Sequence, residues 1–219
     1  MKKVDKYRSY LSRVIVEETS SKYNDKLVVA IQNGKYVLNS TNANYSFASL
    51  HRVFQQALKL VNLREKQDIL VLGCGAGSIP SIIYKEFKLN AAIDAVEIDE
   101  QVIRLGNKYF GLNHYENLTI IIGNALNYVK TANKKYDLIC VDLFKGIQVP
   151  DEFLSQQFFQ QLNNLLVANG EILFNFVAYN YETKEQVKTI EEGLESVFKT
   201  VKVHRFEEVN RIFHIKKKE

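Results

Sequence analysis

Short apolar runs and amphipathic stretches alternate along the chain from residue 68 onward. The apolar runs predict strands at Ile69–Leu72, Ala91–Ile98, Leu118–Ile122, Tyr136–Val141 and Glu171–Phe176. The stretches between them have helical spacing, near Ser78–Phe87, Glu100–Phe110, Ala125–Thr131 and Glu152–Val167. Apolar strands alternating with helices are typical of a parallel sheet with both faces covered. The pattern therefore predicts an α/β fold with a doubly wound sheet.

The two ends of the chain have different patterns. After a predicted helix at Thr183–Phe198, alternating strands follow at Val201–Phe206 and Arg211–Ile215, too close together for a crossover, so they have to pair antiparallel. Near the other end, Leu27–Ile31 and Lys35–Asn39 flank an Asn-Gly pair, which favours a type I′ hairpin turn. A β-branched run at Arg13–Glu17 and an amphipathic helix over Ser46–Asn62 complete the pattern. We expect seven strands in one mostly parallel sheet, closed by an antiparallel pair.

The composition is that of an ordinary globular protein. Of 219 residues, 46% are hydrophobic and 25% are charged, which excludes a disordered or collagen-like chain. At roughly 150 residues per domain, this length predicts one domain with a small appendage. We expect a β-hairpin extension over residues 1–45 and the α/β domain over residues 46–219.

Charge and cysteine usage narrow the partners. The net charge of +4 is too small and too dispersed to indicate nucleic-acid binding. No apolar run approaches the roughly 18 residues of a membrane helix, and no apolar signal segment follows the basic N-terminus. We therefore expect a cytoplasmic protein that binds neither nucleic acid nor membranes. Cys74 and Cys140 are the two cysteines, and no Cys/His cluster has metal-ligand spacing, so no metal site is expected.

A glycine-rich turn, Gly73-Cys74-Gly75-Ala76-Gly77, joins a predicted strand to a predicted helix. Glycines bring bare backbone close to a ligand, and the helix N-terminus offers free N–H groups. A tight β–α connection without a ligand is the other interpretation. Glu97 favours the ligand, because it ends the next strand 20 residues beyond Gly77, where a carboxylate accepts ribose hydroxyls. Together these residues predict a nucleoside site.

The glycine spacing separates NAD from S-adenosylmethionine. NAD requires a third glycine that lets the helix pack close under the pyrophosphate. Here Ser78 follows Gly77, so the spacing is GxGxG and not GxGxxG. The antiparallel terminal pair is also unlike a typical dehydrogenase. Both observations favour a ligand without pyrophosphate.

Two further strand ends contribute candidates. Asn124 and Ala125 follow the third strand of the α/β domain, where Asn124 is suited to the adenine amino group and Ile98 to the face of the ring. Asn124 is equally suited to cap the following helix. Asp142 ends the fourth strand, which neighbours the first in doubly wound folds, so it faces the reacting end of the ligand. A carboxylate there orients an amine nucleophile or takes its proton, unless it only caps the following loop.

At these residues the chain resembles the spermidine synthase-like branch of the class I S-adenosylmethionine-dependent methyltransferase superfamily. The resemblance extends from Leu27 to about Phe176. It rests on Val71 before the glycine turn, on the stretch Glu97-Ile98-Asp99-Glu100, and on Tyr136-Asp137-Leu138-Ile139 leading to Asp142-Leu143-Phe144. It implies a Rossmann-like fold that binds S-adenosylmethionine or its decarboxylated form. It also implies a homodimer.

The departures from that branch concern acidic residues. Aminopropyltransferases have an aspartate in the glycine turn that holds the aminopropyl amine, and Ala76 stands there instead. The second aspartate of their polyamine loop is replaced by Lys145, the expected acid after the third strand by Asn124, and the acid after the N-terminal tyrosine by Phe47. Each exchange of a carboxylate for an ammonium near a dication changes the interaction by a few kcal/mol, roughly. Spermidine synthesis is therefore disfavoured.

We accordingly expect a methyltransferase that acts on a small or amine-bearing acceptor. The candidate cofactor-binding residues are Gly73, Cys74, Gly75, Ala76, Gly77, Glu97, Ile98, Asn124 and Ala125. Asp142 is the candidate catalytic residue, and the candidate acceptor-binding residues are Tyr45, Lys145 and Tyr179. Two alternatives stay open: an aminopropyltransferase with an altered acceptor, and an inactive nucleoside-binding or assembly protein that kept the fold. The expected partner is a small-molecule acceptor.

Overall fold

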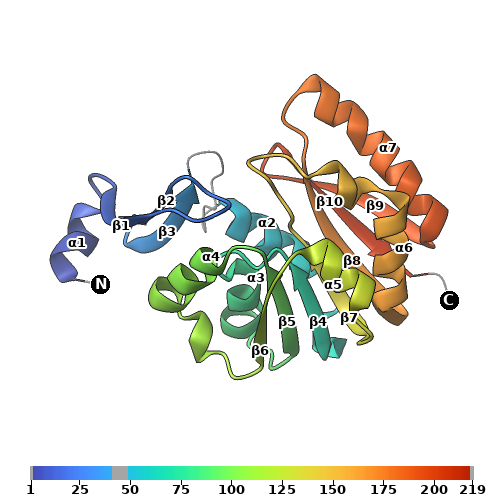
Figure 1. Cartoon of the computed structure of the whole chain (residues 1–219), viewed down its shortest axis with the longest axis horizontal. Coiled ribbons are helices and arrows are strands. Elements are labelled where there is room, and N and C mark those ends of the chain that lie inside the picture. The colour runs from blue at the N-terminus through green and yellow to red at the C-terminus, as the bar shows by residue number, and fades with distance from the viewer. Residues whose placement is uncertain (1, 41–48, 218–219) are drawn as a thin grey trace.

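The computed structural model describes residues 2–40 and 49–217, and its centre is a seven-stranded sheet (Figure 1). The strand order is β6-β5-β4-β7-β8-β10-β9. Neighbours among β4 to β8 are parallel, whereas β10 is antiparallel to both β8 and β9, which confirms the predicted sheet. The strands are β4 (Asp68–Leu72), β5 (Ala92–Glu97), β6 (Leu118–Ile122), β7 (Tyr136–Val141), β8 (Leu166–Val177), β9 (Thr200–Phe206) and β10 (Asn210–Lys216).

Helices cover both faces of this sheet (Figure 1). One face packs against α2 (Ser49–Ala57), α3 (Ser78–Ser81) and α4 (Glu100–Leu105), and the other against α5 (Ala125–Thr131), α6 (Gln156–Leu165) and α7 (Tyr181–Val197). Successive residues of β4 alternate between the two cores, Ile69 and Val71 in one, Leu70 and Leu72 in the other. Burial on both faces explains why the strands are continuous apolar runs. In the part of the chain that the structure describes, no helix has the length and apolar character to cross a membrane.

Several helices end or change type where the periodicity alone does not show it. The helices α3 and α4 continue as π-helical segments at Ile82–Glu86 and Gly106–Phe110. The stretch predicted as one helix over Glu152–Val167 is a 3₁₀ turn at Asp151–Leu154 followed by α6. Further 3₁₀ turns lie at Leu58–Leu60, Leu63–Glu65 and Leu112–His114.

The N-terminal residues form α1 (Lys3–Arg8) and a separate antiparallel sheet of β1 (Val14–Thr19), β2 (Leu27–Gln32) and β3 (Lys35–Ser40). Asn33 and Gly34 join β2 to β3 with φ of 49° and 74°, the positive pair that a type I′ turn requires, so the predicted hairpin is confirmed. The predicted domain boundary at residue 45 and the predicted helix start at Ser46 lie outside the described residues.

The small sheet is fixed to α4 and the segment after it. Glu17 on β1 accepts hydrogen bonds from Arg104 at 2.6 Å, from Lys108 at 2.6 Å and from Tyr109 at 2.5 Å. These contacts hold the Glu17 pKa at about 2. Beneath them, side chains of β2 and β3 share a core with α4 and with Ala76 of the glycine turn. The extension therefore lies directly beside the predicted nucleoside site.

Candidate active site

A cavity of about 620 Å³ opens at the carboxyl ends of the central strands. The strand order reverses between β4 and β7, and doubly wound folds bind their ligands at that switch point. The structure therefore brings strand ends from distant parts of the sequence into one wall. The predicted site residues that line it are Gly73, Gly75, Glu97, Ile98, Asn124, Ala125, Asp142 and Lys145.

The glycine turn presents bare backbone to this cavity. At Gly73, where φ is 88°, an added Cβ would lie 2.1 Å from the carbonyl oxygen of Asp142, so no side chain fits. At Gly75, where φ is 53°, an added Cβ would meet no described atom within 4 Å. Gly75 lines the cavity, and its missing side chain leaves that volume to a ligand.

The other three residues of the turn serve packing. Cys74 lies in the core together with Cys140, Ala76 packs with the N-terminal sheet, and an added Cβ at Gly77 would meet Leu112 at 2.2 Å. None of the three is among the described residues that line the cavity. Burial raises the pKa of both thiols, so neither cysteine is a thiolate at neutral pH.

Glu97 ends β5 with its carboxylate buried beside the glycine turn. Its Oε2 accepts the N–H of Gly75 at 2.8 Å, and its Oε1 accepts the N–H of Asp99 at 3.0 Å. Burial raises the Glu97 pKa, while these two backbone N–H groups oppose that shift. Two fixed oxygens with remaining lone pairs are suited to the hydroxyls of a ribose.

Asn124 has the capping role that the sequence left open. Its Oδ1 accepts the N–H groups of Leu126 at 2.7 Å and of Asn127 at 3.4 Å, so it is the N-cap of α5. It also lines the cavity together with Ala125 and with Ile98, whose side chain is 37% exposed. The cap and a place in the ligand wall are therefore compatible in this residue.

Asp142 faces the cavity from the end of β7. Its backbone N–H donates to the Leu72 carbonyl at 2.8 Å, which ties the strand end to β4. Its Oδ1 accepts a hydrogen bond from Asn175 Nδ2 at 2.9 Å, so the side chain does not cap the following loop. Burial raises the Asp142 pKa to about 7; the Asn175 hydrogen bond opposes this shift, and the charge of Glu97 adds to it. A carboxyl group with that pKa exchanges protons near neutral pH.

The three acceptor-side candidates have different positions. Lys145 lines the cavity from a tight turn in which its N–H donates to the Gln148 carbonyl at 2.8 Å. Tyr179 is not among the described lining residues; its hydroxyl accepts Gln148 Nε2 at 3.0 Å and so braces the same turn. Tyr45 lies outside the described residues.

The N-terminal sheet supplies one wall of the cavity, which no sequence pattern indicated. Lys22, Tyr23 and Asn24, between β1 and β2, line the cavity. The loop is tied to Asp99, whose Oδ2 accepts Ser21 Oγ at 2.5 Å and Asn24 Nδ2 at 2.8 Å. These partners are more than 70 residues apart in the sequence, so no local pattern indicates the contact.

Two asparagines on the acceptor side were also missed. Asn175 and Asn210 line the cavity from β8 and β10. A signal for one of them was available, because Asn175 interrupts an otherwise apolar run and is 1% exposed. A polar side chain buried in a strand needs hydrogen-bond partners, which makes it a candidate for a site.

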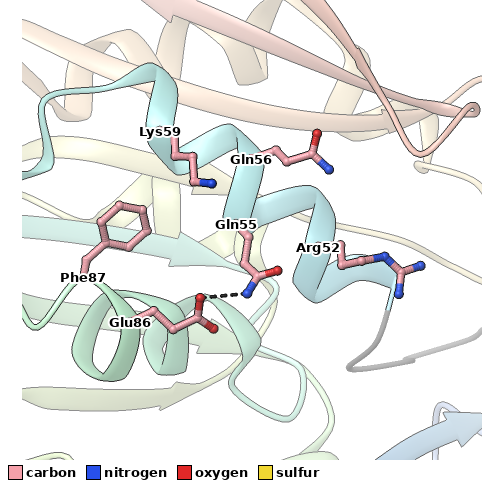
Figure 2. Close-up of a pocket in the computed structure, with 6 residues that line it drawn as sticks. All are labelled: Arg52, Gln55, Gln56, Lys59, Glu86 and Phe87. Atoms are coloured by element: carbon pink, nitrogen blue, oxygen red, sulfur yellow. Dashed lines mark hydrogen bonds between the residues drawn. The ribbon is translucent and has the colours of Figure 1, made fainter.

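A second hollow of about 370 Å³ lies over the outer side of α2 (Figure 2). Gln55 Nε2 donates to Glu86 at 2.7 Å there, and His51 contacts the other oxygen of Glu86 at 2.6 Å. Arg52 is engaged with Glu207 at 2.9 Å. These pairs fix α2 to its neighbours on the surface. Neither here nor elsewhere in residues 2–40 and 49–217 do three metal-ligating side chains come together.

A Rossmann-like sheet of methyltransferase type, with a cavity at its switch point, defines the class of this protein. The family model described as the spermine/spermidine synthase domain matches residues 53–207. The chain belongs to that family.

The similar proteins are named either as methyltransferases or as aminopropyltransferases. The human eEF1A lysine and N-terminal methyltransferase is 31% identical over 157 residues, which are 66% of this chain and 22% of that protein. A polyamine aminopropyltransferase of Vibrio vulnificus is 33% identical over 110 residues, 49% of this chain and 36% of that protein. The crystal structure of human methyltransferase-like protein 13 in complex with SAH has a TM-score of 0.67 and 26% identity, covering 78% of this chain and 83% of that one. The chain thus spans about a quarter to a third of the length of these curated relatives.

Proposed function

We propose that this chain is an S-adenosylmethionine-dependent methyltransferase whose acceptor is an amine. The observation that carries the proposal is the wall around Asp142, in which one carboxylate at the end of β7 is followed by Lys145 in the same cavity. The Asp142 carboxylate is suited to one amine, and the ammonium of Lys145, the next charged side chain along the chain, repels the second charge of a diamine. The human relative and the structural neighbour are both named as methyltransferases.

The residues present fit S-adenosylmethionine. Glu97 offers two oriented oxygens to the ribose, and the open space beside Gly75 admits a ligand against the backbone. Ala76 packs away from the cavity, so the glycine turn has no carboxylate to repel the carboxylate of the methionine part. When bound, this cofactor supplies an electrophilic methyl group on a sulfonium centre.

In this proposal Asp142 removes a proton from the acceptor amine. A primary amine has a pKa near 10 and lacks a free lone pair when protonated at neutral pH. The Oδ2 atom of Asp142 accepts a hydrogen bond from the amine and then takes its proton, which frees the nitrogen lone pair. Since its pKa is about 7, the carboxyl group is an effective base close to neutral pH. Much of the remaining rate comes from alignment of the nitrogen.

The acceptor is proposed only as an amine. A small molecule is what the cavity alone favours, whereas the name of the human relative places the amine on a protein, at a lysine or an N-terminus. Transfer of tritium from methyl-labelled S-adenosylmethionine to polyamines, to free amino acids and to lysine peptides would separate these acceptors.

Calorimetric titration with S-adenosylmethionine and with its decarboxylated form tests the proposal. We expect the intact cofactor to bind at least tenfold more tightly. Tighter binding of the decarboxylated form would instead favour aminopropyl transfer, the activity in the name of the Vibrio relative. If neither form binds, the fold serves a purpose other than transfer.

Lys145→Asp tests the part of the argument that concerns charge. The variant replaces an ammonium in the wall by a carboxylate, so we expect putrescine to bind at least tenfold more tightly than to the wild type. Lys188→Asp is the matched control, because Lys188 is 83% exposed on α7. Equal effects in the two variants would contradict the assignment of Lys145 to the acceptor site.

A further inference from the structure

Two side-chain amides connect Asp142 to the last strand pair of the sheet. Asn210 Nδ2 donates to Asn175 Oδ1 at 3.0 Å, and Asn175 Nδ2 donates to Asp142 Oδ1 at 2.9 Å. The register places them together, since β7 ends with Val141 beside Phe174 of β8, and Asn210 of β10 lies opposite Val177. Three adjacent strands thus meet through polar side chains at the carboxyl edge.

Burying an asparagine side chain at position 175 is energetically unfavourable unless its amide is hydrogen-bonded. Its side chain is 1% exposed and lies between Phe174 and Phe176, where a leucine would bury more apolar surface. A buried amide is tolerated when both of its ends are hydrogen-bonded, and both ends of Asn175 are. Its two partners are the reason for an amide here.

The direction of the two hydrogen bonds is set by Asp142. An ionised carboxylate only accepts, so Asn175 Nδ2 has to face Oδ1, and Asn175 Oδ1 then faces away from Asp142. Asn210 completes the chain, because its Nδ2 donates to that outward-facing oxygen. The other oxygen, Oδ2, accepts no hydrogen bond from any residue that the structure describes.

We propose that Asn175 and Asn210 are positioning residues, which together hold Oδ1 of Asp142 and leave Oδ2 for the acceptor amine. The identity of that amine rests on the proposed function, whereas the arrangement of the three side chains does not. The proposal gives the antiparallel strand pair a part in the site, because Asn210 is the first residue of β10. That end of β10 is held by the bond from Ala178 N–H to the Val209 carbonyl at 2.8 Å.

The two hydrogen bonds that run from Asn210 through Asn175 to Asp142 form a relay of amides, and this relay affects the pKa of Asp142. The charged groups around the same cavity are Glu97 at the end of β5, Asp99 after it, Lys145 and Glu152 after β7, and Lys22 before β2. Among the described side chains, Asn175 is the one that donates a hydrogen bond to Asp142. An N–H donor stabilises the ionised carboxylate, so its removal raises the Asp142 pKa.

Carboxyl ¹³C NMR of the full chain tests the relay without any turnover. The Asp142 resonance is identified by its absence in Asp142→Asn. We expect Asn175→Leu to move its titration midpoint upward by about one pH unit. Asn210→Ala should move it in the same direction by less, because Asn175 Oδ1 then loses its donor and the amide is held less firmly against Asp142. In the Asn175→Leu background, Asn210→Ala should add nothing.

Asn24→Ala is the matched control, because Asn24 also lines the cavity and donates to a carboxylate, that of Asp99. It should leave the Asp142 midpoint in place. An unchanged midpoint in both Asn175→Leu and Asn210→Ala would overturn the relay, and so would an equal shift in Asn24→Ala. Asn210 is partly exposed at a strand start, so Asn210→Ala keeps the test available if Asn175→Leu fails to fold.

Kinetics separate this inference from the proposed function. If methyl transfer to an amine occurs, Asn175→Leu should lower kcat at least tenfold, raise the pH at which the rate levels off, and leave the KM for the cofactor unchanged. Transfer without any of these changes would overturn the relay alone. Shifted NMR midpoints without transfer to any amine would support the geometry and contradict the proposed function.

Discussion

Glu97 and Asp142 are two carboxylates in one cavity with different sets of partners. Both oxygens of Glu97 accept backbone N–H groups, whereas one oxygen of Asp142 accepts a side-chain amide. Burial raises the pKa of both groups. A carboxylate held on both oxygens is suited to binding, and one with an open oxygen and a pKa about 7 is suited to proton transfer.

Glu97→Ala tests the binding role. In the proposed function Glu97 accepts the ribose hydroxyls, and the variant removes that acceptor, so we expect the affinity for S-adenosylmethionine to fall by about 1–3 kcal/mol. Calorimetry at constant pH measures it. Glu100→Ala is the control, because Glu100 is an exposed carboxylate three residues further on. An unchanged affinity in Glu97→Ala would place the ribose elsewhere.

Asp142→Asn tests the raised pKa through stability. An unfolded aspartate ionises near pH 4, and the folded group has a pKa of about 7. Between these values the folded chain retains a proton that the unfolded chain releases, so this group lowers stability as pH rises from 4 to 7. We expect the Tm of the variant to exceed that of the wild type by about 10 °C at pH 8 and by little at pH 4.

Differential scanning fluorimetry at the two pH values makes the comparison. Asp151→Asn, at an exposed position in the same loop region, is the control and should show no pH-dependent difference from the wild type. Equal Tm differences at pH 4 and pH 8 in Asp142→Asn would indicate a change in packing and not in ionisation.

The N-terminal sheet is the element that the local patterns described least completely. Its hairpin follows from the Asn-Gly pair, but its place does not, because Glu17 meets Arg104 and Lys108 across about 90 residues of sequence. The loop from Lys22 to Asn24 is held beside the cavity by other contacts of the same sheet, from Ser21 and Asn24 to Asp99. Docking of this sheet is therefore expected to influence ligand binding.

Glu17→Ala tests that link. The variant leaves Arg104, Lys108 and Tyr109 without their shared acceptor, so we expect amide hydrogen exchange in β1 to accelerate about tenfold and cofactor affinity to decrease. Glu18→Ala is a close control, because the neighbouring carboxylate pairs with the half-exposed Lys26. Equal exchange rates in the two variants would show that apolar contacts alone dock the sheet.

Other elements show where local patterns suffice. The bounds of β6, β7 and α5 agree with those predicted, and Asn124 caps the start of α5. The bounds of β8 do not: the strand begins at Leu166, directly after α6, and Asn169 adopts a φ of 59° within it.

In the site, the positions of Gly75, Glu97 and Asp142 could be predicted from strand ends and turn chemistry. The partners of Asp99 and Asp142 depend on sheet register and on tertiary docking, which no local pattern contains.

At the scale of the whole molecule, buried carboxylates have different surroundings at the two edges of the main sheet. At the carboxyl edge, Asp142 has a raised pKa and an open oxygen. Toward the amino edge, Glu171 is buried and fully paired, with Lys66 at 2.9 Å, His214 at 2.6 Å and Lys216 at 3.4 Å. Burial alone would raise the Glu171 pKa, but the hydrogen bonds from His214 and Lys66 outweigh it and hold the pKa at about 2.

This pairing joins three parts of the chain, since Lys66 precedes β4, Glu171 lies on β8 and His214 lies on β10. Glu171→Gln would leave the buried Lys66 ammonium without its counter-charge, and we expect the free energy of unfolding in urea at pH 7 to fall by about 3–5 kcal/mol. Because a lowered carboxyl pKa stabilises the fold above its unfolded value and loses that effect as pH falls toward 2, the difference should shrink at pH 3. Glu195→Gln, at an exposed position on α7, should leave stability unchanged.

The affinity for S-adenosylmethionine, measured under conditions in which Glu171→Gln is folded, should also be unchanged, because the cavity lies at the other edge of the sheet. A loss of binding in this variant would mean that the two edges of the sheet are coupled.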